Sequence, residues 1–250
     1  MARRLADGSD DPLGLLAMAG LAALAWTQRR WLRPSPALAW LALATTLTLS
    51  ATLARPWLAP LASSLLAVLA MASALLAFLP RHIAAAPVLG LAVLALPLLS
   101  SLQFYAGYPL RVLAAEGARW LLAPFFTVWR EGSTLLVDGR LIVVDAPCSG
   151  VQMVWLGYAT ACAMALWERL DDRRVLARLP GVGLLVLAGN VLRNALLGAA
   201  EAAGRPLPHW GHEALGLAVL GAVCAGVGLL MRHGWPALVQ PKGVAHAEPA

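Results

Sequence analysis

Charged side chains are scarce in this chain of 250 residues: 13% of the sequence is Asp, Glu, Lys or Arg, and 60% is hydrophobic. Soluble domains average about 25% charged residues. A polypeptide with so few charges and a mean hydropathy of +0.72 cannot cover a globular surface with polar groups, which excludes an ordinary water-soluble protein. The composition predicts a polytopic membrane protein in which one helix bundle accounts for the whole length.

Acidic residues are also few, with 13 against 19 basic ones, so the net charge is +6. Basic proteins often bind nucleic acid, but the sequence contains no basic stripe interleaved with aromatic residues. In a membrane protein, basic residues instead mark the cytoplasmic loops. Nucleic acid is therefore not an expected partner.

Cysteine is rare as well, and the three cysteines exclude a disulfide framework. Cys162 and Cys224 lie within apolar runs, where a free cysteine behaves as a small hydrophobic side chain. Cys148 differs from them because it stands at the predicted entrance of a helix. It is therefore the cysteine that the sequence singles out for chemistry.

Long apolar runs dominate the rest of the chain. A helix needs about 20 residues to cross a bilayer, within a range of roughly 17–25. This length predicts an all-α polytopic membrane protein with about seven transmembrane helices, the first of which is short enough to lie at the interface instead. The predicted spans are 12–27, 36–54, 57–79, 83–102, 150–167, 179–200 and 213–231. The fourth contains Pro87 and Pro97, which membrane helices tolerate as kinks.

The basic residues predict the orientation of these spans. Ten of the 19 fall on one side of the membrane: Arg29, Arg30, Arg33, Arg81, Arg169, Arg173, Arg174, Arg178, Arg232 and Lys242. Because positive charge accumulates in cytoplasmic loops, we expect this side to face the cytoplasm. The chain is then a multi-pass protein of the cytoplasmic (inner) membrane, and residues 103–149 lie on its extracytoplasmic face.

Residues 103–149 combine an amphipathic segment with a hairpin signal. Residues 108–122 carry charges within an apolar run, which predicts a short helix lying on the membrane. The runs 133–137 and 140–144 are rich in branched apolar residues and flank Asp138-Gly139, a pair that accepts the positive φ angles of a two-residue turn. The sequence therefore predicts a β-hairpin shortly before Cys148.

Cys148 is the predicted nucleophile. A thiol at the first turn of a helix meets the partial positive charge of unpaired backbone N–H groups, which favours the thiolate. Ser149 can cap the helix or supply an N–H group to a developing oxyanion, and Gly150 allows another backbone to approach closely. The alternative interpretation is a structural thiol packed at the end of a helix.

Arg193 is a cation inside a predicted span, where an arginine at the helix centre costs about 2.5–3.5 kcal/mol on insertion scales. Arg193 and Asn194 follow Asn190 by three and four residues, so the three polar groups share one helical face. This polar stripe indicates a hydrated or substrate-lined cavity. The alternative is an arginine whose side chain snorkels to the membrane surface.

His212 stands just before the last predicted span and is the predicted general acid and base. His209 competes for this role, although it falls in a predicted flexible loop with Pro206 and Pro208. The two histidines lack a third ligand at a convincing spacing, so no metal is expected. No other cofactor is expected either.

The predicted topology brings Cys148, Arg193 and His212 to the same membrane face. A thiol, a fixed cation and an imidazole that meet there could carry out acyl transfer. Cys224 is excluded from this site because it lies 12 residues beyond His212, which is about 18 Å along a helix. Cys162 is excluded by the same argument.

Three motifs in this order resemble the exosortase/archaeosortase family over roughly residues 85–232. They are Cys148-Ser149-Gly150 entering a span, Asn190-x-x-Arg193-Asn194 late in the next, and His212-x-x-x-Gly216 opening the last. The resemblance implies a membrane-embedded cysteine protease/transpeptidase with Cys148 as nucleophile, Arg193 as transition-state stabiliser and His212 as general acid/base. The expected oxyanion and positioning residues are Ser149, Gly150, Asn190 and Asn194.

Enzymes of this kind cleave the C-terminal sorting signals of exported proteins through a thioester. The signal is a short motif such as Pro-Glu-Pro, a transmembrane helix and a basic tail. The implied partners are this signal, membrane lipid and a polysaccharide or lipid acceptor. The expected organisation is N-terminal transmembrane helices at 1–82, an exosortase-like catalytic core at 83–232 and a disordered cytoplasmic tail at 233–250.

Two other functions remain open at this stage. One is a non-enzymatic membrane subunit in surface-polysaccharide export, in which the thiol is incidental. The other is a transporter in which Arg193 binds an anionic substrate.

Overall fold

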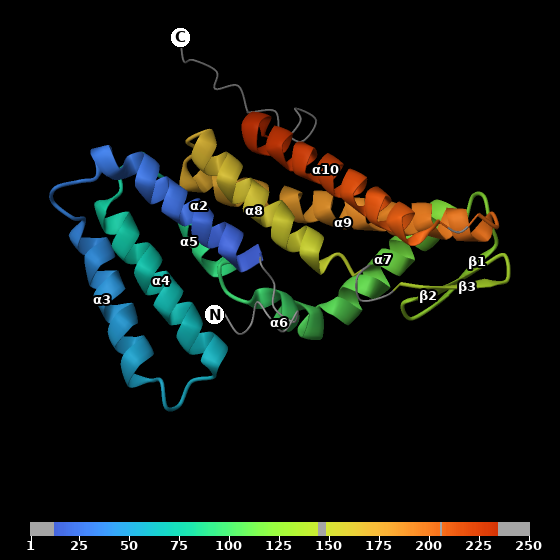
Figure 1. The fold of residues 1–250 in the computed structure, drawn as a ribbon, viewed down its shortest axis with the longest axis horizontal. Helices are drawn as coiled ribbons and strands as arrows, with labels where there is room; N and C mark the ends of the chain where they lie inside the picture. The colour runs from blue at the N-terminus through green and yellow to red at the C-terminus, as the bar shows by residue number, and fades with distance from the viewer. Residues whose placement is uncertain (1–12, 145–148, 206, 235–250) are drawn as a thin grey trace, which may run out of the picture.

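The computed structural model describes residues 13–144, 149–205 and 207–234. Within them most residues are helical, and three short strands form one sheet (Figure 1). The helices are α2 (Leu13–Gln28), η1 (Arg29–Trp31), α3 (Leu38–Leu53), α4 (Pro60–Phe78), α5 (Ala85–Leu94), α6 (Leu98–Tyr105), α7 (Gly107–Leu122), α8 (Val151–Trp167), α9 (Asp172–Ala202) and α10 (His209–His233). The strands are β1 (Val128–Glu131), β2 (Thr134–Val137) and β3 (Arg140–Val143).

The number of spans differs from the prediction. Among the described residues, α4, α9 and α10 are long and apolar enough to cross a membrane, and α5 with α6 makes a fourth if the two count as one span. α3 and α8 are apolar but shorter, with 16 and 17 residues. The membrane character of the chain is confirmed, and the count of seven is not.

Helices α8, α9 and α10 pack side by side (Figure 1). Their shared core consists of small and branched side chains, including Ala161, Val182, Val186, Val223 and Val227. In lipid, helices associate through close van der Waals packing rather than through the expulsion of water. Small and branched side chains suit this packing because they let the helix backbones approach.

Gly189 lies where α9 packs tightly against both of its neighbours. A Cβ atom added at Gly189 would lie 2.3 Å from Cγ2 of Val223 in α10 and 3.4 Å from Sδ of Met153 in α8. Only a residue without a side chain fits there. The position of α9 relative to its two neighbours therefore depends on this glycine.

The predicted span 83–102 is broken rather than kinked. α5 and α6 meet at an angle of 82° across a short break, and Pro97 stands directly before α6. Proline cannot donate a helical hydrogen bond, and it disfavours helical geometry in the residue before it. The break sends α6 away from α5 and towards the start of α8, with which it makes contact.

α7 confirms the helix predicted at 108–122, starting one residue earlier. One of its faces packs on α9: Ala114, Ala115 and Ala118 are fully buried, and a Cβ atom at Gly117 would lie 2.6 Å from Val191. Leu113 and two other large apolar side chains, Trp120 and Leu121, remain exposed. Protein therefore covers one side of α7, and the other side carries exposed apolar side chains.

The predicted hairpin is confirmed. Asp138 and Gly139 have φ angles of 47° and 80°, as the two-residue turn requires, and Val137 pairs with Arg140 across it. β1 is an additional strand that the sequence did not predict, and it pairs antiparallel with β2. The sheet packs against α7 and lies at the end of the bundle where α9 ends and α10 begins (Figure 1). We call this the hairpin end.

Glu116 fastens α7 to the sheet. Its carboxylate accepts from Arg119 at 2.7 Å, from Trp120 at 2.8 Å and, across the fold, from Arg130 of β1 at 2.6 Å. α7 is not one of the membrane-crossing candidates. Hydrogen bonds from Arg119 and Arg130 lower the pKa of Glu116 to about 2.

The packing at Gly189 predicts a large effect of one added methyl group. Gly189→Ala should destabilise the protein by about 1–3 kcal/mol, because the core has no room for the methyl group. Gly221→Ala in α10 is the matched control, since a Cβ atom there meets nothing within 4 Å. The measurement is the thermal unfolding midpoint of each variant in detergent. Equal midpoints for the two variants would contradict this packing.

The low pKa of Glu116 predicts a pH dependence. Because this pKa lies below the ordinary 4.5, the carboxylate stabilises the folded state above about pH 4.5, and this contribution is lost as the pH falls towards 2. The difference in Tm between wild type and Glu116→Gln should therefore narrow from pH 6 to pH 3. Glu213→Gln, which removes an exposed carboxylate 3.6 Å from His209, is the control. A difference that stays constant over this range would disprove the assignment.

Candidate active site

The start of α8 differs from the sequence-based expectation. Cys148 lies outside the described residues, and α8 begins at Val151. The residue before it, Gly150, caps the helix with a φ angle of 83°. The expected first turn of the helix therefore begins three residues after Cys148. Ser149 and Gly150 are the described residues that join the two.

Ser149 is tied to a residue that the sequence analysis did not single out. Ser149 is 2% exposed, and its hydroxyl donates to Oε1 of Gln103 in α6 at 2.9 Å. The Oγ atom of Ser149 also accepts from the backbone N–H of Val151 at 3.4 Å. The available signal for Gln103 was that it is the single amide of a short segment that otherwise contains apolar residues and two serines.

Gly150 lies directly against Asn190 of α9. A Cβ atom at Gly150 would be 2.7 Å from Cγ and Nδ2 of Asn190, and its positive φ also favours glycine. The group that approaches Gly150 is thus a side-chain amide rather than a second backbone. This contact joins the start of α8 to the middle of α9.

Protein encloses the two amides of the polar stripe in α9. Asn190 and Asn194 are 3% and 5% exposed, and Nδ2 of Asn194 donates to the backbone oxygen of Asn190 at 2.8 Å. Neither amide is presented to lipid. The two amides therefore belong to the interior of the bundle.

Arg193 lies against α10. A Cβ atom at Gly216 would be 3.2 Å from Nε and 3.4 Å from Nη2 of Arg193, so the guanidinium occupies the space that a side chain would take. The side chain of Arg193 is half-buried. Its charge is therefore carried at the interface of α9 and α10.

His212 precedes Gly216 by one helical turn, which puts both residues on the same face of α10. His212 is half-buried. The expectation for His209 was wrong in one respect: it is the first residue of α10 rather than part of a loop. The side chain of His209 is 91% exposed, and its Nδ1 atom lies 3.6 Å from Oε1 of Glu213.

The described residues joined by these contacts and the helices that carry them hold four kinds of polar group. They are a buried hydroxyl, two amides, a guanidinium and the face of α10 that carries an imidazole. Amide and guanidinium N–H groups can stabilise negative charge on a reacting oxygen, and an imidazole can transfer protons. Cys148, the predicted nucleophile, is the residue before Ser149 in the chain.

The other two cysteines lie apart from this group. Cys162 is buried in α8, where a Cβ atom at Gly90 would be 2.7 Å from its sulfur. Cys224 accepts from Thr160 at 3.5 Å and lies about three turns along α10 from His212. Among the described residues, no group of three or more His, Cys, Asp or Glu side chains is arranged to hold a metal ion.

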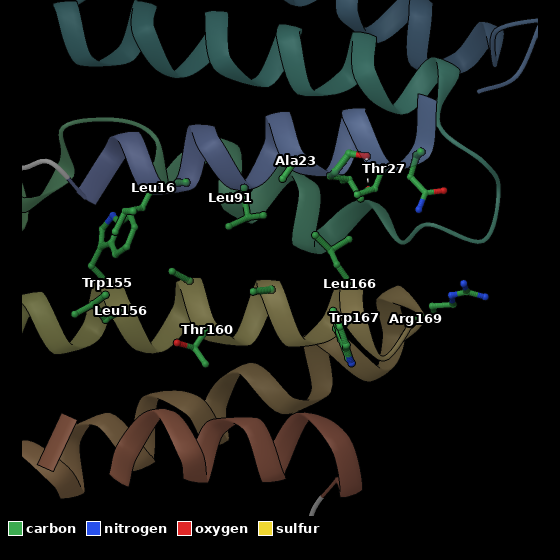
Figure 2. A pocket seen from close by; sticks show the side chains of 16 residues that line it. Leu16, Ala23, Thr27, Leu91, Trp155, Leu156, Thr160, Leu166, Trp167 and Arg169 are labelled. Carbon is green, nitrogen blue, oxygen red and sulfur yellow. Dashed lines mark hydrogen bonds between the residues drawn. The ribbon is translucent and has the colours of Figure 1, made fainter. Parts of the chain in front are cut away.

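A cavity of about 660 Å³ lies between α2 and α8 (Figure 2). Side chains from both helices face each other across it, and its lining contains none of the predicted site residues. Most of the lining is apolar; the polar members are Thr27, Gln28, Thr160 and Arg169. These four groups provide no nucleophile with an adjacent base, so we assign no reaction to this cavity.

Comparison with known proteins tests the resemblance. A family model described as transmembrane exosortase matches residues 5–229, which includes the N-terminal helices as well as the region that carries the motifs. No curated protein and no solved structure matches the chain. Because the family model covers most of the sequence, the chain belongs to the transmembrane exosortase family.

Proposed function

We propose that this exosortase is a cysteine protease/transpeptidase that cleaves the C-terminal sorting signals of exported proteins. One observation carries the proposal: Gly150 packs on Asn190, and Arg193, three residues further along the same helix, packs on Gly216. These two contacts join the starts of α8 and α10 through a polar segment of α9. Family membership supports the same reaction.

In the proposed reaction, the Cys148 thiolate attacks the scissile carbonyl and forms a thioester as the peptide C–N bond breaks. Arg193 and the buried amide of Asn190 hold the oxyanion, together with the backbone N–H of Ser149 or Gly150. His212 donates its proton to the departing amine. It then takes a proton from the acceptor amine or water that releases the product.

We further propose that the site lies on the extracytoplasmic face of the inner membrane. Arg173 and Arg193 are 20 residues apart in α9, which is about 30 Å at 1.5 Å per residue. His212 and Arg232 are equally far apart in α10. This separation matches the thickness of a bilayer core, and basic residues mark the cytoplasmic side. The substrate helix would cross the membrane beside the bundle and present its motif at the hairpin end.

One observation favours a transporter as the second candidate. The sharply bent pair α5–α6 is a broken helix, and transporters use such helices around substrates. A transporter or an assembly subunit would not need the thiol of Cys148, whereas the proposed enzyme requires it. Substitution of this residue therefore separates the candidates.

Substitution at the three catalytic positions should abolish or strongly reduce processing. Cys148→Ala and Cys148→Ser should leave no product, Arg193→Gln should lower the rate about 10²–10³-fold, and His212→Asn about 10²–10⁴-fold. The assay follows cleavage of a reporter with a C-terminal motif, a transmembrane helix and a basic tail, by immunoblot of membranes. His209→Asn is the matched control for His212→Asn and should retain activity, because His209 is exposed. Full processing by Cys148→Ala would refute the enzyme.

The contact between Gly216 and Arg193 predicts a second effect. Gly216→Val should displace the guanidinium and lower processing about 10²-fold, since a shift of about 1 Å in a reacting group has this effect. The fold should persist because the displaced group is the end of a flexible side chain. Gly221→Ala, in open space on the same helix, should process normally. Unchanged processing by Gly216→Val would show that the placement of Arg193 is not needed.

A further inference from the structure

We propose that Gln103 is a positioning residue of this site. Its side-chain oxygen holds the hydroxyl of Ser149 and thereby sets the peptide that leads to Cys148. The inference deepens the proposed function and rests on Cys148 being the nucleophile. It goes beyond the three motifs, because Gln103 belongs to none of them.

The geometry around Ser149 is the first support. A hydroxyl that is 2% exposed has few hydrogen-bond partners available, and its donor is used by Oε1 of Gln103 at 2.9 Å. The hydroxyl then presents its lone pairs to the N–H of Val151 at the start of α8. Gln103 therefore fixes the rotamer of Ser149 and, through it, the way in which residues 149 and 150 enter α8.

The placement of Gln103 is the second support. The 82° break before α6 turns this helix towards the start of α8. The next two residues, Phe104 and Tyr105, are 79% and 77% exposed, whereas Gln103 is half-buried. Its side chain also packs against Gly107, where a Cβ atom would lie 3.1 Å from Cδ and Nε2. The fold thus directs the one amide of α6 inwards and leaves room for it.

A purely structural role would also place an amide beside a buried hydroxyl. The two roles differ in their effect on the thiol. If Gln103 sets the loop before α8, its substitution changes the reactivity of Cys148 and the rate of the chemical step. If Gln103 only provides a hydrogen-bond partner for Ser149, its substitution changes the stability of the protein alone.

The first experiment measures the rate at which iodoacetamide alkylates Cys148 in the full-length protein, from pH 6 to pH 10. Cys148→Ala gives the background from the other cysteines. Gln103→Glu keeps an acceptor for Ser149 but adds a negative charge, which disfavours the thiolate and should lower alkylation at pH 7 about tenfold. Phe104→Glu places the same charge on the exposed side of α6 and should leave the rate unchanged.

The second experiment is a double-mutant cycle on processing of the reporter. Gln103→Leu should lower kcat about 10–100-fold with KM unchanged, because the loop is misplaced while substrate binding is not. If Gln103 acts through Ser149, the double variant with Ser149→Ala should be no slower than the slower single variant. Gln103→Glu should recover more activity than Gln103→Leu when the pH is raised.

Two results would overturn the inference. One is an alkylation profile that Gln103→Glu and Phe104→Glu leave equally unchanged. The other is a strictly additive effect of Gln103→Leu and Ser149→Ala. Failure of the proposed function gives a different result. In that case Cys148→Ala would still process the reporter, and the alkylation rates would still show whether Gln103 influences the thiol.

Discussion

The close approach of α9 to its two neighbours is the contact on which the site depends. Gly189 has no side chain, and Val223 of α10 lies where one would be. At the next residue, the amide of Asn190 packs on Gly150 before α8. Because α9 continues without a break through these positions, the same contact sets Arg193 one turn further on. Any displacement of α9 would move the amide and the guanidinium together, so the groups that we propose to bind the oxyanion behave as one rigid unit.

Hydrogen bonds between neutral groups order the interior of this unit. Ser149 donates to Gln103, and Asn194 donates to the backbone oxygen of Asn190. A buried polar group without a partner costs about 1–3 kcal/mol, and hydrogen bonds strengthen where the local dielectric is low. The apolar bundle therefore makes these few bonds effective. The bond from Ser149 to Gln103 ties the start of α8 to α6 without a charged partner.

Local signals in the sequence predicted part of this arrangement. The turn at Asp138 and Gly139 follows from the conformations that these residues accept, and Arg193 stood out because a cation is costly among apolar residues. Pro97 gave no such guidance, since proline is compatible with a mild kink and with a complete break. The 82° angle depends on packing between distant segments. Gln103 could not be assigned for this reason: its role exists only because α6 turns towards α8.

Helix lengths explain why residues far apart in the sequence meet at one level of the bundle. α8 runs for 17 residues after Gly150, and α9 runs antiparallel beside it. Asn190 lies opposite Gly150 because a similar number of α9 residues precedes it. α9 then continues beyond the start of α8 for about three turns before the chain reverses into α10. The chain therefore needs about two turns of α10 to return to the level of Arg193, where Gly216 lies. His212 stands one turn nearer the hairpin end. In the proposed reaction, a substrate carbonyl held by Arg193 would thus have the imidazole on the side towards the hairpin end, where the amine would leave and the acceptor would enter.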